Sequence, residues 1–391
     1  MLQKSLGCWP PRGRRRGAPQ HIGACEAVKN CYLYRRGAEA QRKARFFKPQ
    51  RLRASVVKRI SGDYFTAPCA VRHDRLPTTR AMMRSEPWPH PSLAGRHALC
   101  QTPTMISAET RQRYAEEIGK NAKLRSTALL QAFAKVPREE FVGKGPWKVL
   151  SRPAAGSSQP QVAEITDPAE LYRDVAVLLD ALRNLTNGNP GTLAPWLDGL
   201  NLSEGKSVFH LGCGAGYYTA VIAEAVGPAG QVTAAEIDPS LAAQARANLA
   251  RYPNVQVIEG DGGAADTGAR DAILINAGVT HPRESWLDNL RPAGCLVLPL
   301  TVEIGMPHVG KGMVLHVSRI GSGYAARFLP VPVMIYSCSS VRDSQFSSLL
   351  GQQFMSGTFS SVQSLRKDEH SAEPSCWLHT SSFCLSTRPI I

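Results

Sequence analysis

Long apolar runs are missing from this chain of 391 residues. No stretch approaches the roughly 18 consecutive apolar residues that a membrane-spanning helix needs. The first residues also lack the apolar segment of a secretory signal. No internal repeat is present, which argues against a solenoid or a propeller. These absences favour a cytoplasmic protein without a membrane partner.

Acidic residues are scarce in the first quarter of the chain. Residues 1–104 hold 21 Lys plus Arg but 5 Asp plus Glu, whereas residues 105–391 hold 25 basic and 26 acidic side chains. The basic excess therefore does not indicate nucleic-acid binding by the folded part. Three interpretations of residues 1–104 stay open: an organellar transit peptide, a basic nucleic-acid arm, or translated sequence upstream of a start at Met105. Tryptophans and cysteines in this segment favour the last. Beyond Met105, Ser107 could cap a helical run.

A glycine-rich turn lies near the middle of the chain. The short apolar run Ser207–Leu211 has the character of a buried parallel strand, and Gly212, Gly214 and Gly216 follow it. A helix over residues 217–226 would then direct its positive amino end toward the same spot. A dinucleotide fingerprint needs glycine at position 217, where this chain has Tyr. The observed spacing, G-x-G-x-G, is typical of S-adenosylmethionine (SAM) methyltransferases.

Two carboxylates follow at expected strand ends. Glu236 ends the run 231–237, about 20 residues after the last glycine, where a carboxylate can accept both hydroxyls of a ribose. A solvated charge at a strand end is the alternative. Asp238 and Pro239 then cap and begin a helix. After a third apolar run, 255–258, Asp261 would lie within reach of an adenine amino group.

Strands and helices alternate through this region. Further apolar runs occur at 271–276 and 294–299, with a helix-sized stretch between them. Five such strands predict an α/β fold with a doubly wound, mostly parallel, Rossmann-like sheet. Runs at 313–320 and 324–333 around Gly321-Ser322-Gly323 predict an antiparallel hairpin at the sheet edge. We expect a basic extension at 1–104, a helical substrate-side segment at 105–200, a cofactor-binding core at 201–334 and an α+β carboxyl-terminal extension at 335–391.

Six short motifs stand out between about Met105 and Val333. They are VPREEFV at 136–142, YYTA at 217–220, EIDP at 236–239, GDG at 260–262, DAILINAG at 271–278 and LRPAGCLVLPL at 290–300. Together they resemble the protein-L-isoaspartate O-methyltransferase family. The resemblance implies SAM as the cofactor. It implies that Glu236 holds the ribose, that Asp261 and the backbone of Gly262 meet the adenine, and that three glycines surround the amino-acid end of SAM: Gly212, Gly214 and Gly216.

Two segments depart from the family pattern. The family usually has Asp or Glu two residues before the first glycine, where this chain has His210. We include His210 among the cofactor-binding candidates, and a hydrogen-bonded strand-end histidine without a ligand role is the alternative. At the family's acceptor loop, which resembles G-x-G-Q-T-I-S-Q-P, this chain has LTNGNPGT at 185–192. Ser157–Pro160 (SSQP) is closer by letters, but its position before the Leu171–Asp174 motif marks a chance match in a linker.

The resemblance implies methyl transfer from SAM to a carboxylate of a protein or peptide, with isoaspartyl residues as the first choice. A carboxylate is already ionised at neutral pH, so the reaction needs no general base, and positioning supplies most of the rate. We expect the acceptor to be oriented by four residues of a loop that could also be a plain turn: Thr186, Asn187, Asn189 and Thr192.

Other functions stay open at this point. They are a dedicated peptide or natural-product O-methyltransferase, a Rossmann protein that binds a nucleotide without catalysis, and an NAD enzyme. The expected protein is a monomer with a protein or peptide substrate, and no nucleic-acid partner is expected for the folded part.

The ten cysteines divide evenly between residues 1–104 and the remainder. Cys213 in the glycine turn and Cys295 in an apolar run fit buried, reduced thiols. Cys376, His379 and Cys384 form a lone C-x-x-H with one more cysteine, and this weak pattern predicts no metal site. Three histidines stand singly in polar surroundings and are expected to be surface or structural residues: His281, His370 and His379.

Overall fold

The computed structural model describes residues 106–151 and 161–390. These residues fall within one compact unit, Gly95–Ile391. The predictions for residues 1–104 and for Ser157–Pro160 lie outside the described residues, and the domain boundaries stay predictions. None of the helices in the two described ranges combines the length and the apolar character that crossing a bilayer requires.

Five parallel strands form the centre of a ten-stranded sheet. Their spatial order is β7 (Val255–Glu259), β6 (Gln231–Glu236), β5 (Ser207–Leu211), β8 (Arg270–Ile275) and β9 (Leu290–Glu303). Each neighbouring pair is parallel. The first strand of the series lies in the middle, so the chain winds outward in both directions from β5. The predicted doubly wound parallel sheet is confirmed.

Both faces of this sheet are buried, because side chains along each strand alternate between two apolar clusters. One cluster contains Val208, Ala272, Leu274 and Val297, and the other contains Phe209, Ile273, Ile275 and Leu296. Helix α6 (Tyr217–Val226) packs in the first cluster, while α8 (Glu284–Asp288) contributes Trp286 and Leu287 to the second. Burial on both faces explains the unbroken apolar runs that mark the strands in the sequence. Helix α7 (Pro239–Asn248) begins at the expected cap, Asp238.

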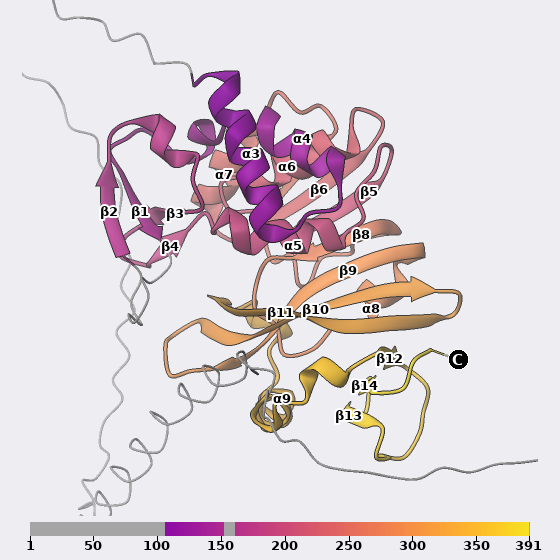
Figure 1. The fold of residues 1–391 in the computed structure, drawn as a ribbon. Coiled ribbons are helices and arrows are strands. Elements are labelled where there is room, and N and C mark those ends of the chain that lie inside the picture. The colour runs from indigo at the N-terminus through magenta and orange to yellow at the C-terminus, as the bar shows by residue number, and fades with distance from the viewer. Residues whose placement is uncertain (1–105, 152–160, 391) are drawn as a thin grey trace, which may run out of the picture. The chain divides into compact units, whose positions relative to one another are not determined.

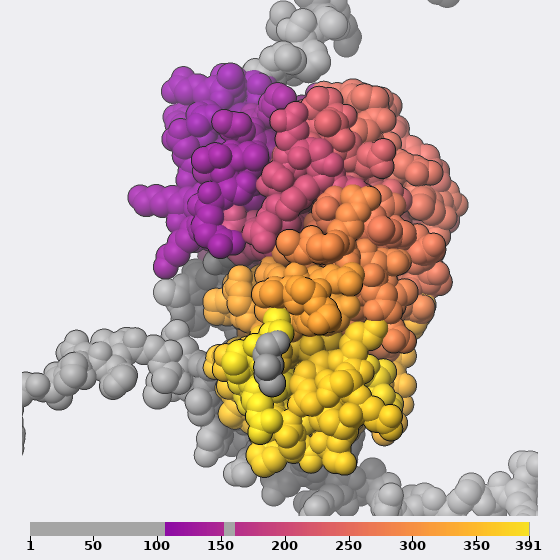
Figure 2. All heavy atoms as spheres, turned by 90° about the vertical axis from the view of Figure 1, so that its right-hand side faces the viewer, coloured from indigo at the N-terminus to yellow at the C-terminus, as the bar shows by residue number. Residues whose placement is uncertain are grey.

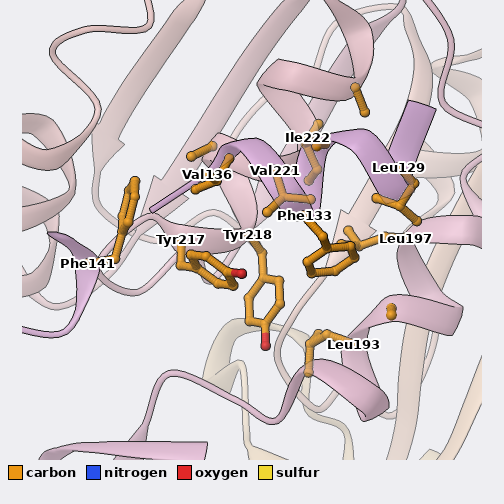
Figure 3. Close-up of a cluster of buried hydrophobic side chains, with 14 of the residues drawn as sticks. Leu129, Phe133, Val136, Phe141, Leu193, Leu197, Tyr217, Tyr218, Val221 and Ile222 are labelled. Carbon is orange, nitrogen blue, oxygen red and sulfur yellow. The ribbon is translucent and has the colours of Figure 1, made fainter. Parts of the chain in front are cut away.

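The amino-terminal segment adds helices and a small second sheet. Helix α3 (Ala108–Ala122) begins at the predicted cap Ser107, whose Oγ accepts from the Thr110 N–H at 3.1 Å. Helices α4 (Thr127–Lys135) and α5 (Pro190–Gly199) lie near α3 and α6 (Figure 1). Figure 3 shows Phe133 of α4 and Leu193 of α5 beside Tyr218 of α6. Helix η3 (Arg138–Phe141) and η4 (Pro168–Leu171) join these helices to a sheet of order β2 (Gln161–Ile165), β1 (Trp147–Ser151), β3 (Ala176–Asp180) and β4 (Leu185–Thr186).

The predicted hairpin forms, but it is not the edge of the sheet. Strands β10 (Val309–Ile320) and β11 (Gly323–Tyr336) pair antiparallel, and Gly321 adopts φ 60° in the two-residue turn between them. The carboxyl-terminal extension then adds β12 (Ser364–Arg366), β14 (Cys384–Ser386) and β13 (Cys376–His379) beyond β11. Edge strands offer unpaired backbone groups, and β12 pairs with those of β11 near the hairpin turn. The expectation of an edge hairpin is therefore wrong.

The same extension contributes helices on the side of β9–β11 that lies away from α5 (Figure 1). They are η5 (Ser339–Val341), α9 (Ser344–Ser356) and η6 (Phe359–Ser361). Leu350 of α9 belongs to the second apolar cluster, so this helix covers one face of the long strands. The predicted α+β character of the extension is confirmed.

Candidate cofactor and acceptor site

A cavity of about 730 Å³ lies at the carboxyl ends of the parallel strands. This volume suits a ligand of the size of a nucleoside derivative. Its lining comes from the glycine turn after β5, the ends of β6 and β7, the loop before α5 and the segment after β11. In open α/β sheets, ligands bind outside the carboxyl ends of the strands where the winding reverses, and β5 and β8 are the strands at that point.

The glycine turn presents backbone atoms to the cavity. Gly212 and Gly214 line it, with φ of 75° and 56°. A Cβ on Gly212 would meet the Asn276 carbonyl oxygen at 2.8 Å, whereas a Cβ on Gly214 would have no atom within 4 Å. Gly216, with φ 96°, is the amino-terminal cap of α6 and is not among the lining residues. Gly214 thus leaves open space near the start of α6, whereas Gly212 allows close packing against Asn276.

Glu236 connects the turn to the next strand. One of its carboxylate oxygens accepts from the Gly214 N–H at 2.8 Å, and the other accepts from the Asp238 N–H at 3.0 Å. The side chain is 7% exposed and lines the cavity. Each carboxylate oxygen can accept more than one hydrogen bond. Glu236 therefore keeps capacity for hydroxyl groups of a ligand.

Asp261 and Gly262 lie at the third strand end, where they line the cavity. Oδ1 of Asp261 accepts from the Gly263 N–H and from the Ser340 hydroxyl, both at 2.9 Å. A Cβ on Gly262 would lie 2.9 Å from side-chain atoms of Ala235 and Leu211. Glycine is needed there because the chain passes close to two strands.

His210 does not reach the cavity. Its side chain is fully buried, and Nδ1 lies 2.9 Å from the Thr219 hydroxyl of α6. Burial lowers the pKa of His210 to about 3, so the ring is neutral. The residue is not among those that line the cavity, and this placement argues against a direct cofactor contact. On β5, position 210 points toward α6, which is why a residue two positions before Gly212 ends up inside the protein.

The four acceptor candidates line the cavity, but they do not form one loop as expected. Thr186 belongs to β4, Asn187 and Asn189 lie between β4 and α5, and Thr192 lies in the first turn of α5. Asn187 Oδ1 accepts from the Val177 N–H at 2.8 Å, and Asn189 Nδ2 donates to the Asp174 carbonyl at 2.9 Å. Among the described residues, Nδ2 of Asn187 and Oδ1 of Asn189 are buried without a hydrogen-bond partner. The Tyr218 hydroxyl donates to the Gly188 carbonyl at 3.1 Å and fixes the loop to α6. Two residues that line the cavity thus carry covered polar atoms without partners, and their role toward an acceptor stays a prediction.

Several lining residues were not predicted from the sequence. Asn276 donates through Nδ2 to the Gly212 carbonyl at 3.0 Å, which ties β8 to the glycine turn. Cys338 lies beside Asp261, and burial raises the pKa of its thiol. Arg183 lies on the turn between β3 and β4 and forms an ion pair with Asp238, the amino-terminal cap of α7. Asn276 is the last residue of the DAILIN motif. Its position directly after an apolar run is the one sequence feature that could have predicted its place at the strand end.

Arg138 of the VPREEFV motif holds the backbone segment that leads to the acceptor candidates. The guanidinium is fully buried and donates to the carbonyls of Leu171, Arg173 and Val175. Its carbon lies 5.7 Å from the ring centre of Tyr217. These bonds fix the segment that leads into β3 and the acceptor loop. Arg138 itself does not line the cavity, so its effect on the acceptor residues is indirect.

Comparison with known proteins places the chain in a family. The family model described as protein-L-isoaspartate(D-aspartate) O-methyltransferase matches residues 109–308, just over half of the 391 residues. The chain belongs to this family. A protein-L-isoaspartate O-methyltransferase of Methanothrix thermoacetophila is 35% identical over 179 residues, which cover 45% of this chain and 74% of that protein. One of Methanopyrus kandleri is 33% identical over 200 residues, or 50% and 78% of the two chains.

Solved structures include similar chains. A protein-L-isoaspartate O-methyltransferase aligns with a TM-score of 0.48 at 20% identity, covering 63% of this chain and 69% of the other. A Plasmodium falciparum structure described as a putative member, in complex with S-adenosyl-L-homocysteine, aligns with a TM-score of 0.43 at 16% identity, covering 58% and 97%. The residues that match the family model, 109–308, include the whole glycine turn, Glu236, Asp261 and the acceptor loop. Strands β10 to β14 lie beyond these residues.

Proposed function

We propose that this protein transfers the methyl group of SAM to the carboxylate of an L-isoaspartyl residue in proteins or peptides. Membership of the family supports this activity. The observation that carries the proposal is that one cavity is lined by both Glu236 with its glycine turn and the loop with unpaired amide atoms. A cofactor and an acceptor can therefore meet in a single cavity.

The residues on the cofactor side fit SAM. The open space at Gly214 leaves room for the amino-acid end, and the buried carboxylate of Glu236 can accept the ribose hydroxyls. Asp261 and the Gly262 backbone would meet the adenine, as the family resemblance implies. When bound, SAM supplies an electrophilic methyl group on a sulfonium. We assign no cofactor contact to His210 or Gly216.

The acceptor side supports carboxylate binding. Asn187 lines the cavity, and its Nδ2 is a covered donor without a partner among the described residues, so a substrate carboxylate that displaces the covering atoms would satisfy it. The Thr186 hydroxyl oxygen accepts from the Gly188 N–H at 3.3 Å, so its own proton stays available for donation. Both groups are neutral donors, so they can bind a carboxylate without protonating it. We assign them the orientation of the acceptor.

No general base is needed for this reaction. The Cys213 thiol lines the cavity, and burial raises its pKa to about 12, so it is protonated at neutral pH. The acceptor carboxylate is already ionised. Rate acceleration then comes from holding the carboxylate oxygen in line with the methyl group and from excluding water.

The rim of the cavity suits a peptide. Ile237, Met306 and Met334 line the cavity and are 60%, 45% and 60% exposed. Exposed apolar side chains at the mouth of a cavity fit the side chains that flank an acceptor residue in a polypeptide. Flexible methionine side chains can adapt to varied neighbours, as a repair enzyme requires.

Labelled-methyl transfer tests the proposal. The full chain should label an isoaspartyl peptide strongly and its normal aspartyl twin weakly, and the product should be labile to base because it is an ester. Equal labelling of the twin or of small carboxylic acids would favour a dedicated peptide or natural-product methyltransferase. A base-stable product would rule out carboxyl methylation. If no carboxylate is labelled, the alternative of a protein that binds a nucleotide without catalysis would be favoured.

We also propose a reducing, cytoplasmic location. Five cysteines of the described residues carry free thiols: Cys213, Cys295, Cys338, Cys376 and Cys384. Free thiols persist in reducing compartments. The monomeric state and the lack of a nucleic-acid partner stay predictions from the sequence.

A further inference from the structure

Four metal-binding side chains meet in the carboxyl-terminal extension, far from the cavity in sequence and outside the residues that match the family. They are His370, Cys376, His379 and Cys384, and one ligand atom from each lies within 4.8 Å of the others. We propose that these four residues bind a structural zinc ion. The proposal is independent of the proposed methyl transfer, because none of the four lines the cavity.

The donor set is that of a closed zinc site. Two thiolates and two imidazoles match the Cys₂His₂ class, in which protein ligands fill all four positions. A tetrahedral zinc ion holds sulfur and nitrogen ligands about 3.3–3.8 Å apart. Cys376 Sγ already lies 3.6 Å from His370 Nε2, and the rings of His370 and His379 are 4.8 Å apart between centroids. The largest separation between ligand atoms, 4.8 Å, would have to contract by about 1.0–1.5 Å to complete the tetrahedron.

The backbone of β13 is shaped to bring its two ligands to one side. Cys376 and His379 are three residues apart, so a regular strand would direct them to opposite faces. The pairing of β13 with β14 shifts register between Cys376 and Leu378, which is one extra residue on β13. After this bulge, His379 is opposite Cys384, and Cys376 is opposite Ser386, two residues from Cys384. All three ligands therefore share a face.

The residues between the ligands anchor the opposite face. Trp377 is 4% exposed, and its ring centre lies 5.2 Å from that of Phe328 on β11. Leu378 is opposite Leu385, and both are buried in the second apolar cluster. The bulge thus sends apolar side chains into the core while it collects the ligands on the other side. Figure 2 shows the carboxyl-terminal residues gathered in one lobe against the strands that precede them.

Hydrogen bonds around the cluster have the pattern of an outer shell of a metal site. Nδ1 of His370 lies 2.8 Å from the Asp368 carbonyl, so it can donate there while Nε2 faces Cys376. The Glu373 N–H donates to Cys376 Sγ at 3.4 Å. Nδ1 of His379 is buried without a hydrogen-bond partner among the described residues. An imidazole left unsatisfied in this way is consistent with a missing ligand.

A metal would meet a stability need of this segment. Strands β13 and β14 have four and three residues, so few backbone hydrogen bonds hold this pair together. His370 lies in the loop between β12 and β13, so a shared ion would tie this loop to both strands. Loops and short strands of this kind are commonly held by structural zinc.

Metal analysis of the full chain, purified without a histidine tag or added metal, tests the proposal. We expect about one zinc ion per chain, and less than about a tenth of that in Cys384→Ser and His370→Ala. Cys295→Ser is the matched control, because it removes a buried thiol elsewhere and should keep full zinc content. Zinc-free wild-type protein, or full zinc in the two ligand variants, would overturn the proposal.

A second measurement covers variants that fail to fold. Wild-type protein stripped by a chelator and titrated with cobalt should show the intense visible bands of tetrahedral coordination and a thiolate charge-transfer band. A weak octahedral spectrum would refute the site, as would a disulfide between Cys376 and Cys384 found by mass spectrometry of the purified protein. SAM titration of the same samples keeps this result separate from the proposed methyl transfer.

Discussion

At the scale of single residues, the informative atoms are buried polar atoms without partners among the described residues. They include Nδ2 of Asn187, Oδ1 of Asn189 and Nε2 of His210. Leaving such an atom unpaired costs about 1–3 kcal/mol. The two loop atoms belong to residues that line the cavity, whereas His210 of β5 faces α6 and does not line it.

Asn187→Asp should impair acceptor binding and leave SAM affinity unchanged. The variant keeps the Oδ1 acceptor for the Val177 N–H but replaces the unpaired donor with a negative oxygen that repels a carboxylate. Loss of one hydrogen bond to a charged group, about 1.5–3 kcal/mol, predicts a fall of roughly 10- to 150-fold in kcat/KM for an isoaspartyl peptide. Steady-state kinetics and SAM calorimetry measure the two effects.

Asn254→Asp is the matched control for this change. Its Nδ2 donates to the Gly227 carbonyl at 2.9 Å, away from the cavity lining, so its kcat/KM should match wild type. An Asn187→Asp variant with wild-type kinetics would mean that Asn187 does not hold the acceptor.

The buried His210 predicts loss of stability in acid. Its pKa is about 3 in the folded protein and about 6.5 in the unfolded chain, so the unfolded state takes up a proton that the folded state does not. Stability from this residue is complete above pH 6.5 and falls as the pH drops toward 3, by about 2 kcal/mol between pH 6.5 and 4.5. His210→Gln cannot bind this proton. Urea unfolding at both pH values should show a smaller acid loss in the variant, and parallel losses would contradict the assignment.

At the scale of elements, the turn between β5 and α6 separates two roles of glycine. Gly212 and Gly214 both have positive φ, but only Gly212 packs against backbone, at the Asn276 carbonyl. Gly214 faces open space in the cavity wall. One glycine therefore serves close packing and the other serves ligand access.

Alanine substitutions should resolve these roles. Gly212→Ala should unfold most easily, because a positive φ strain of about 1–2 kcal/mol adds to a backbone clash. Gly214→Ala should suffer the strain alone but lose SAM affinity, since its Cβ enters the cavity. Gly205→Ala is the control, with φ 81° and open space away from the cavity. Calorimetry and thermal unfolding distinguish the three variants, and equal SAM affinity for Gly214→Ala and Gly205→Ala would count against the cofactor site.

At the scale of the whole molecule, every residue that lines the cavity lies between Phe141 and Ser339. Cofactor binding should therefore stabilise the folded unit as a whole. SAM at 100 times its Kd should add about 2.7 kcal/mol to the free energy of unfolding, and NAD should add nothing. Thermal shifts with SAM, S-adenosylhomocysteine and NAD make the comparison.

Glu236→Gln should reduce the shift with SAM, because an amide cannot accept both ribose hydroxyls as a carboxylate does. Stabilisation of the wild type by NAD alone would reverse the choice of cofactor. A full shift in Glu236→Gln would remove the ribose assignment.

The sequence by itself determined the parallel sheet, the helix caps at Ser107 and Asp238, and the glycine turn. These features depend on neighbours within a few residues: an apolar run buried on both faces, a capping oxygen, and glycines where φ is positive. The tertiary structure alone decided that His210 turns away from the cavity, that Asn276 supports the glycine turn, and that β12 to β14 extend the sheet beyond the hairpin. It also decided the cluster of His370, Cys376, His379 and Cys384, because the strand bulge and the loop that gather these ligands leave no periodic trace in the sequence.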